Sequence, residues 1–150
     1  MKALKPFRQT PGLCGPASLK ILLSHYGKEF TEAELAQLCQ TTAERGTDHA
    51  PLIKAAEKIG GRVIVKKEAT LDDVKRFIDK NDPVIVGWWS DDGDHYSVVY
   101  DIDDTFVYLM DPQFEEGVTR IEKKTFLDIW YDFDGPESVR VDRWMMALEK

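Results

Sequence analysis

One of the two cysteines lies where a turn meets a predicted helix, in the stretch QTPGLCGPAS. At the start of that helix, Cys14 is exposed to the positive end of the helix dipole and to N–H groups without helical partners, which both stabilise a thiolate. Gly15 permits close approach of a substrate to the backbone, and Pro16 is tolerated in a first helical turn. Cys14 is therefore a candidate nucleophile. The alternative is a buried, inert residue at a helix start.

A nucleophilic cysteine needs a base, and His95 is the best placed of the three histidines. It opens the predicted strand HYSVVY directly after an acidic loop, so its side chain can project from a rigid strand end into a cleft. His25 and His49 belong to predicted helices, and we interpret them as surface or capping residues. His95 is the candidate general base, and its alternative is a half-exposed strand residue without chemistry.

A carboxylate can orient that imidazole, and Asp111 lies in Met110-Asp111-Pro112 at the end of the next predicted strand. In an antiparallel pair, the register decides whether two side chains share a face. A two-residue turn at 103–104 would place His95 and Asp111 on opposite faces. The catalytic interpretation therefore requires a three-residue or five-residue connection, or a β-bulge.

Gln9 adds a hydrogen-bond donor near the candidate nucleophile. Attack of a thiolate on an acyl carbon creates an oxyanion, which donors fixed beside the nucleophile stabilise. The side-chain amide of Gln9 and the backbone N–H of Cys14 could supply two such donors. Alone, a glutamine at this position would indicate little. Together with the other three residues it completes a set of groups suited to acyl transfer.

The elements that must position these residues divide the chain into a helical half and a strand-rich half. Helices are predicted from Cys14 to Tyr26, after Thr31, at 48–60 and after Thr70, with one strand at 62–65. Strands are then predicted at 84–89, 95–102, 105–110, 118–121 and 139–148, with a short helix at 124–131. This order predicts the α+β class, with a mainly antiparallel sheet and a cleft between the layers.

The composition predicts one soluble domain spanning residues 1–150, because 43% of the residues are hydrophobic and 11% are aromatic. No run of about 18 apolar residues is present, and the start MKALKPFRQT lacks the apolar segment of a signal peptide. We therefore expect a cytoplasmic protein without membrane insertion. The formal charge of −7, with no concentrated basic face, argues against nucleic acid as a partner.

No cofactor or metal is expected either. There is no C-x-x-C pair, and the histidines are scattered, so zinc-site spacing is missing. Acidic residues gather at 91–94 and 101–104, but an EF-hand loop beginning at Asp101 would need glycine where Phe106 stands. Acidic turns between strands are typically solvated. Peptides or small molecules are therefore the expected partners.

Five segments, in order, resemble the bacteriocin-processing (double-glycine) type of cysteine peptidase domain, of the papain-like superfamily: QTPGLCGPAS, GTDHAPLIKAAEKIGG, PVIVGWW, HYSVVYDI and LMDPQFEEG. The resemblance implies a papain-like fold in which a helical N-terminal half packs on a mainly antiparallel sheet. It implies Cys14 as the nucleophile and His95 as the general base and acid. It also implies Asp111 as the residue that orients the histidine and Gln9 as the oxyanion donor.

The function that the resemblance implies is that of a stand-alone cysteine peptidase acting on a peptide or protein substrate. It would cleave peptide bonds, for example after Gly-Gly, through an acyl-enzyme intermediate. Because the chain has no predicted membrane span and no G-x-x-x-x-G-K-[ST] loop, an exporter partner would be a separate protein. The oligomeric state stays undetermined.

Two other functions remain open. One is a non-catalytic peptide-binding domain of the same fold. It is favoured by the five-position step from Gln9 to Cys14, since the family usually has six. Leu13 also stands where exporter-linked members usually carry aspartate. The other is a related thiol acyltransferase or deamidase. Labelling with a thiol-reactive probe separates the binding domain from the enzymes.

Overall fold

The computed structural model describes residues 4–149, so the first three residues of the start MKALKPFRQT and Lys150 lie outside the described range. Five helices are found within it: α1 (Cys14–His25), α2 (Glu32–Leu38), α3 (His49–Gly60), α4 (Leu71–Asp79) and α5 (Lys123–Ile129). The strands in this range are β1 (Arg62–Lys66), β2 (Val84–Ser90), β3 (Gly93–Ile102), β4 (Phe106–Met110), β5 (Val118–Glu122), β6 (Tyr131–Asp134), β7 (Val139–Asp142) and β8 (Trp144–Glu149).

Local capping explains where two of the helices begin. Thr31 caps α2, and its hydroxyl accepts from the backbone N–H of Glu34 while the Glu34 carboxylate accepts from the Thr31 N–H. Thr70 and Asp73 form the same reciprocal pair at α4. Each box satisfies backbone donors that the first helical turn leaves unpaired. Both helix starts predicted from the sequence are thereby confirmed.

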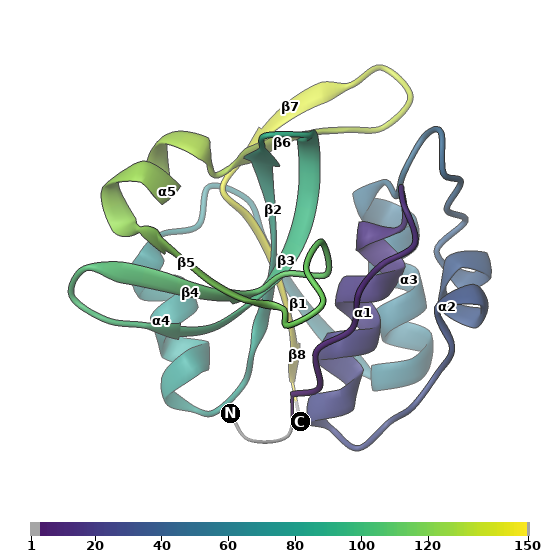
Figure 1. The fold of residues 1–150 in the computed structure, drawn as a ribbon, viewed down its shortest axis with the longest axis horizontal. Helices are drawn as coiled ribbons and strands as arrows, with labels where there is room; N and C mark the ends of the chain where they lie inside the picture. The colour runs from purple at the N-terminus through teal and green to yellow at the C-terminus, as the bar shows by residue number, and fades with distance from the viewer. Residues whose placement is uncertain (1–3, 150) are drawn as a thin grey trace.

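A six-stranded antiparallel sheet runs through the centre of the molecule in the order β1-β8-β2-β3-β4-β5 (Figure 1). A separate two-stranded sheet pairs β6 with β7. Side chains of the central strand β2 alternate between two hydrophobic clusters, with Ile85 in one and Val84 and Val86 in the other. The centre of the sheet is therefore buried on both faces, whereas the edge strands β1 and β5 are largely exposed.

Helices cover both of these faces (Figure 1). On one face, α1 packs on β2 and β3, α3 packs on β1 and β8, and α2 packs against α1. On the other face, α4 and α5 both contact β2. The predicted α+β class and the packing of the first helices on an antiparallel sheet are confirmed. The layers nevertheless do not coincide with the two halves of the sequence. Both β1, which belongs to the main sheet, and α4, which covers its other face together with α5, come from the first half.

The pairing of β3 with β4 contains the β-bulge that a shared face for His95 and Asp111 requires. The register of this pair shifts at a β-bulge between Val99 and Asp101. A one-residue shift exchanges the faces of all side chains beyond it. His95 and Asp111 consequently project from the same side of the sheet, as their hydrogen bond also demonstrates.

The C-terminal segment departs from the prediction. The single strand expected at 139–148 is wrong, because the chain turns at Arg143, where φ is 52°, and leaves the small sheet for the large one. The Arg143 N–H donates to the carbonyl of Trp130 at 2.9 Å, which stabilises this turn. The helix expected at 124–131 ends at Ile129, because the next residues pair as β6.

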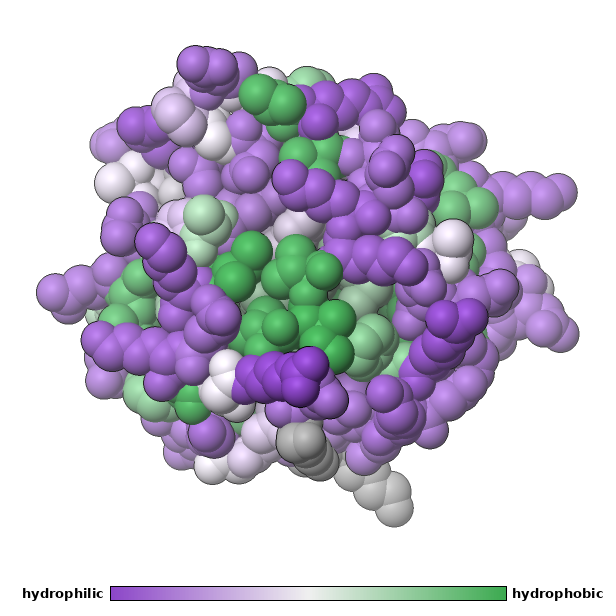
Figure 2. Space-filling view, turned by 180° about the vertical axis from the view of Figure 1, so that it is seen from behind, coloured by the Kyte–Doolittle hydropathy of each residue, from purple (hydrophilic) through white to green (hydrophobic). Residues whose placement is uncertain are grey.

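The face opposite to that of Figure 1 is mostly hydrophilic, with apolar side chains gathered near its centre (Figure 2). Within residues 4–149, no helix combines the length and the apolar character that crossing a bilayer needs. The long helices α1 and α3 have only 12 residues each.

Candidate active site

The first residue of α1 is Cys14, so its own N–H is one of those without a partner inside the helix. The residue before it, Leu13, makes no side-chain cap. Gly15 allows the loop before α3 to come close, because a Cβ there would lie 2.5 Å from the hydroxyl oxygen of Thr47. The helix start is thus held against a neighbouring loop while the Cys14 side chain stays partly exposed.

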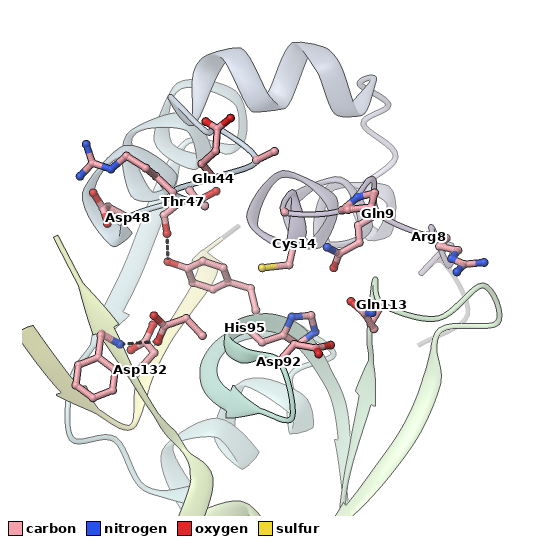
Figure 3. Close-up of a pocket in the computed structure, with 18 residues that line it drawn as sticks. Arg8, Gln9, Cys14, Glu44, Thr47, Asp48, Asp92, His95, Gln113 and Asp132 are labelled. Carbon is pink, nitrogen blue, oxygen red and sulfur yellow. Dashed lines mark hydrogen bonds between the residues drawn. The ribbon is translucent and has the colours of Figure 1, made fainter. Parts of the chain in front are cut away.

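His95 and Asp111 form a buried pair beside this sulfur. The Nε2 atom of His95 lies 2.5 Å from Oδ1 of Asp111, and the two residues are 7% and 3% exposed. The same carboxylate oxygen accepts from the backbone N–H of Gln113 at 3.0 Å. Because Asp111 occupies Nε2, the other ring nitrogen is available to Cys14, whose side chain lies close to the ring (Figure 3).

The electrostatics of the pair favour a charged imidazole. Burial by itself would lower the pKa of His95. The hydrogen bonds and charges of Asp111 and Cys14 outweigh that effect and raise the pKa from 6.5 to about 10. The ring is therefore protonated at neutral pH and faces the sulfur as a cation.

Gln9 reaches the site through a backbone contact with the loop that carries Asp111. Its N–H donates to the carbonyl of Pro112 at 2.7 Å. The side-chain Nε2 makes only a long contact of 3.4 Å, to the carbonyl of Thr10. Its Oε1 is buried without a partner among the described residues. The amide lies beside Cys14 (Figure 3), so the shortened spacing has not removed it from the site.

Gln9, Cys14 and His95 line a cleft of about 710 Å³. Cys14 and His95 lie near its middle (Figure 3). One flank carries Arg8, Gln9 and Gln113, and the carboxylate of Asp92 lies toward Gln113. The other flank is largely acidic, because the carboxylates of Glu44, Asp48, Asp94 and Asp132 outnumber the single guanidinium of Arg45; Thr47 and Phe133 also belong to it. A substrate crossing the nucleophile would therefore meet two chemically different flanks.

The acidic flank was not predicted from the sequence, and the predicted position of one histidine was wrong. His49 was expected at the surface or in a cap, but it is 3% exposed and pairs with Asp132 of β6. The tertiary contact with β6 buries it. The stretch YDFD at 131–134 alternates aromatic and acidic residues, which is a strand pattern, and this signal could have revealed β6.

The remaining cysteine and the acidic loops complete the inventory of reactive groups. Both cysteines are free thiols, and burial raises the pKa of the Cys39 thiol to about 12. Among residues 4–149, no group of three or more histidine, cysteine, aspartate or glutamate side chains is arranged to hold a metal ion. The chemistry that this arrangement can perform is acyl transfer at a thiolate, with a protonated imidazole as the proton donor.

Comparison with known proteins places this cleft in a family. The model of the peptidase C39 family matches residues 8–133. The pediocin PA-1 transport/processing ATP-binding protein PedD of Pediococcus acidilactici is 32% identical over 120 residues, which cover 78% of this chain and 16% of that protein. An uncharacterized protein of Methanothermobacter marburgensis is 37% identical over 125 residues, which cover 82% of this chain and 80% of that protein.

A solved structure shares the fold. It is a double glycine motif protease from an AMS/PCAT transporter, in complex with the leader peptide. Its TM-score is 0.69 at 19% identity, and the match covers 97% of this chain and 92% of that one. At this identity the likeness shows the fold alone, which is papain-like. The family match spans most of the chain and includes the cleft, so the chain belongs to the peptidase C39 family.

Proposed function

We propose that the chain is a cysteine peptidase that cleaves peptide bonds through a Cys14-His95-Asp111 triad. The observation that carries the proposal is the position of His95, which lies between the side chain of Cys14 and the buried carboxylate of Asp111. Membership of the peptidase C39 family supports the same reaction class. The acyltransferase and deamidase alternatives share the first half of the mechanism and differ in the second nucleophile or the leaving group.

In the first step, the Cys14 thiolate attacks the carbonyl carbon of the substrate, so a C–S bond forms and the carbonyl π electrons move to oxygen. The protonated His95 then gives its proton to the departing amine as the C–N bond breaks. In the second step, His95 takes a proton from water, which attacks the acyl-enzyme and releases the carboxylic acid and the thiolate. Asp111 holds the imidazole in place and stabilises its charged form.

The oxyanion formed in both steps needs donors, and we assign this role to the Gln9 amide and the backbone N–H of Cys14. The long contact of Gln9 Nε2 with Thr10 can be exchanged for a better one with an oxyanion at little cost. The backbone bond from Gln9 to Pro112 supports this assignment, because it fixes Gln9 beside the loop of Asp111. This contact compensates for the shortened step to Cys14.

We further propose that the residues before the scissile bond are small, as in a Gly-Gly sequence. Thr47, which lines the cleft, packs directly against Gly15, the residue after the nucleophile, so we expect little room for large side chains there. The related protease named above is a double glycine motif protease, and PedD is named as a transport and processing protein. A peptide or protein substrate, with a separate exporter as partner, is the corresponding proposal for this chain.

The test is incubation of the chain with peptides whose recognition segment ends in Gly-Gly, followed by mass spectrometry of the products. We expect one cleavage after the second glycine in the parent protein and none in Cys14→Ala. Matched Leu-Leu peptides should be poor substrates. If no peptide is cleaved while Cys14→Ala binds peptides as well as the parent does, the chain is a binding domain and the proposal fails.

A further inference from the structure

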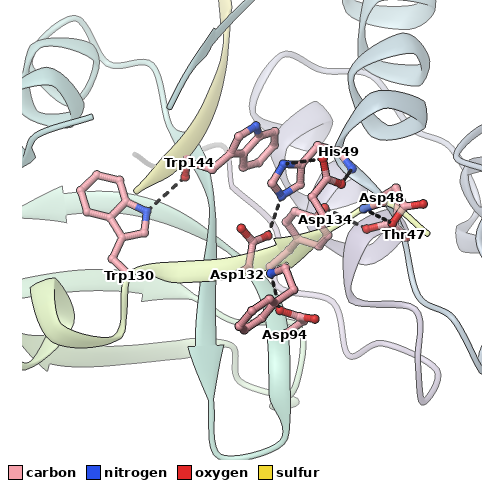
Figure 4. A network of polar contacts seen from close by, with 11 residues as sticks. Thr47, Asp48, His49, Asp94, Trp130, Asp132, Asp134 and Trp144 are labelled. Carbon is pink, nitrogen blue, oxygen red and sulfur yellow. Dashed lines mark hydrogen bonds and ion pairs between the residues drawn. The ribbon is translucent and has the colours of Figure 1, made fainter. Parts of the chain in front are cut away.

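A second histidine–aspartate pair lies behind the acidic flank, and Asp132, its carboxylate, lines the cleft (Figure 4). Nε2 of His49 lies 2.5 Å from Oδ2 of Asp132, and each residue is only 3% exposed. The imidazole stacks on Trp144, with ring centroids 4.2 Å apart and an interplanar angle of 20°. No step of the proposed mechanism uses this pair. Burying two ionisable groups costs desolvation free energy unless they are hydrogen-bonded to each other.

The N-terminus of α3 and the hairpin β6–β7 cap each other across this pair. Asp48 is the N-cap residue of α3 but does not cap its own helix. Its carboxylate accepts instead from the backbone N–H of Gly135, at 3.1 Å. In return, Asp134 accepts from the backbone N–H of His49 at 2.8 Å, at the positive end of the helix dipole. The helix and the hairpin are thus connected through side chains.

A third carboxylate connects the hairpin to the strand of the candidate catalytic base. Asp94 precedes His95 on β3, and its Oδ1 accepts from the backbone N–H of Phe133 at 2.8 Å. Burial, together with the charges of Asp132 and Asp134, raises the pKa of Asp94. The hairpin is therefore attached to α3 and to β3, the two elements between which the acidic flank lies.

A glycine of the main sheet leaves space for the Asp132 carboxylate. A Cβ at Gly87 of β2 would lie 2.5 Å from Oδ2 of Asp132, the oxygen that faces His49. Any larger residue would push the carboxylate away from the imidazole. Trp89, further along β2, packs on Tyr131 and Phe133 and adds ring contacts to the hydrogen bonds that hold the hairpin.

We propose that His49 and Asp132 are positioning residues that fix β6 as one wall of the substrate cleft. The hairpin is not part of the main sheet, and an isolated two-stranded hairpin is marginal, so its position depends on such contacts. Asp132 and Phe133 of β6 line the cleft directly. The inference rests on the proposed peptidase function and adds the residues that position one side of its substrate. The pair sets how tightly a peptide is held, whereas Cys14 and His95 set how fast it reacts.

Two alkylating probes separate these effects. Iodoacetamide is small and reports on the Cys14 thiolate, whereas a peptidyl chloromethyl ketone ending in Gly-Gly must also occupy the cleft. In His49→Ala we expect the rate with the peptidyl probe to fall about 10-fold relative to the rate with iodoacetamide, the effect of one lost charged hydrogen bond. In peptide cleavage, KM should rise by a similar factor while kcat changes little.

Further variants distinguish a positioning role from a general loss of folding. His49→Gln retains a donor for Asp132 and should recover most of the rate ratio. Gly87→Ala keeps both residues but displaces the carboxylate, so it should reproduce the defect of His49→Ala. Asp128→Asn, at an exposed position of α5, is the matched control and should behave as the parent. Thermal unfolding of each variant checks that the fold is intact.

The possible outcomes distinguish the two proposals. If the parent reacts with neither probe at Cys14, the proposed peptidase function fails. If the parent reacts with both, but His49→Ala and Gly87→Ala keep the parental ratio of the two rates, the positioning role is wrong. Equal losses with both probes, accompanied by a lower unfolding temperature, would show a merely structural role and would also overturn it.

Discussion

Two buried imidazole–carboxylate pairs each contribute one residue to the same cleft, His95 from one and Asp132 from the other, and their geometry is nearly the same. Nε2 lies 2.5 Å from a carboxylate oxygen in both His95–Asp111 and His49–Asp132. The pairs differ in the other groups that contact each imidazole ring. His95 faces Cys14, whereas His49 stacks on an indole and meets a second carboxylate. A histidine–aspartate pair by itself therefore does not indicate catalysis. The group beside the other nitrogen decides what the pair can do.

The secondary-structure elements that carry the two pairs differ as well. His95 projects from β3, an inner strand of the six-stranded sheet, and Asp111 follows β4 beside it. His49 begins a helix, and its partner belongs to the separate small sheet. The first pair is thus built within one rigid unit, as a catalytic group needs. The second pair joins α3 to the small sheet, which suits residues that fix β6 as a wall of the cleft.

The largest expected effect distinguishes the two histidines directly. His95→Ala should lower kcat by on the order of 10⁴-fold or more, because it removes the proton donor and the cation that faces the thiolate. His49→Ala should act mainly on KM. Steady-state kinetics with a Gly-Gly peptide measure both. Equal losses of kcat in the two variants would contradict the division of roles.

The next effect concerns Gln9, which touches the reaction only in the transition state. Gln9→Ala should lower kcat by roughly 10²- to 10³-fold, the loss typical of one oxyanion donor, with little change in KM. The unfolding temperature should stay near that of the parent, since the backbone bond to Pro112 is retained. A rise in KM with kcat unchanged would instead make Gln9 a residue of substrate binding.

The two cysteines provide a comparison that needs no substrate. Iodoacetamide at neutral pH should modify Cys14 at least about 10²-fold faster than Cys39, because reactivity follows the thiolate fraction and access. Burial raises the pKa of Cys39 to about 12 and leaves its side chain without exposed surface. Peptide mapping of the labelled protein over time gives both rates. Similar rates would exclude an activated thiolate at Cys14.

The smallest expected effect is on stability, and its sign follows from the raised pKa of His95. The folded-state pKa is about 10, against 6.5 for the free side chain. The pair therefore contributes stability that is fully present below pH 6.5 and is lost as the pH rises through about 10. Below pH 6.5, the parent should exceed His95→Gln by about 2 kcal/mol in unfolding free energy, the contribution of a charged hydrogen bond.

Urea unfolding over this pH range measures that difference, with Asp128→Asn as the control. The advantage of the parent over His95→Gln should shrink between pH 6.5 and 10, whereas the control should follow the parent at every pH. A constant difference would mean that the imidazole is not held in its charged form.

Much of the fold was predictable because its causes are local. The capping boxes at Thr31 and Thr70 need only residues three positions apart, and the continuous apolar run at 84–89 identifies a buried strand without knowledge of its neighbours. The ordered motifs of the chain, which resemble a known family, pointed to the papain-like fold, which the comparison confirms. The catalytic roles of the four site residues stay predictions, and the variants above test those of Cys14, His95 and Gln9.

Tertiary structure decided what depended on distant partners. The sequence could state that His95 and Asp111 need an irregular register, but only pairing of β3 with β4 located the bulge after Val99. It could not show that His49 is buried, because its partner lies 83 positions away on a four-residue strand. So short a strand gains its stability from pairing and side-chain contacts rather than from propensity. The wall of the cleft was therefore visible only in three dimensions.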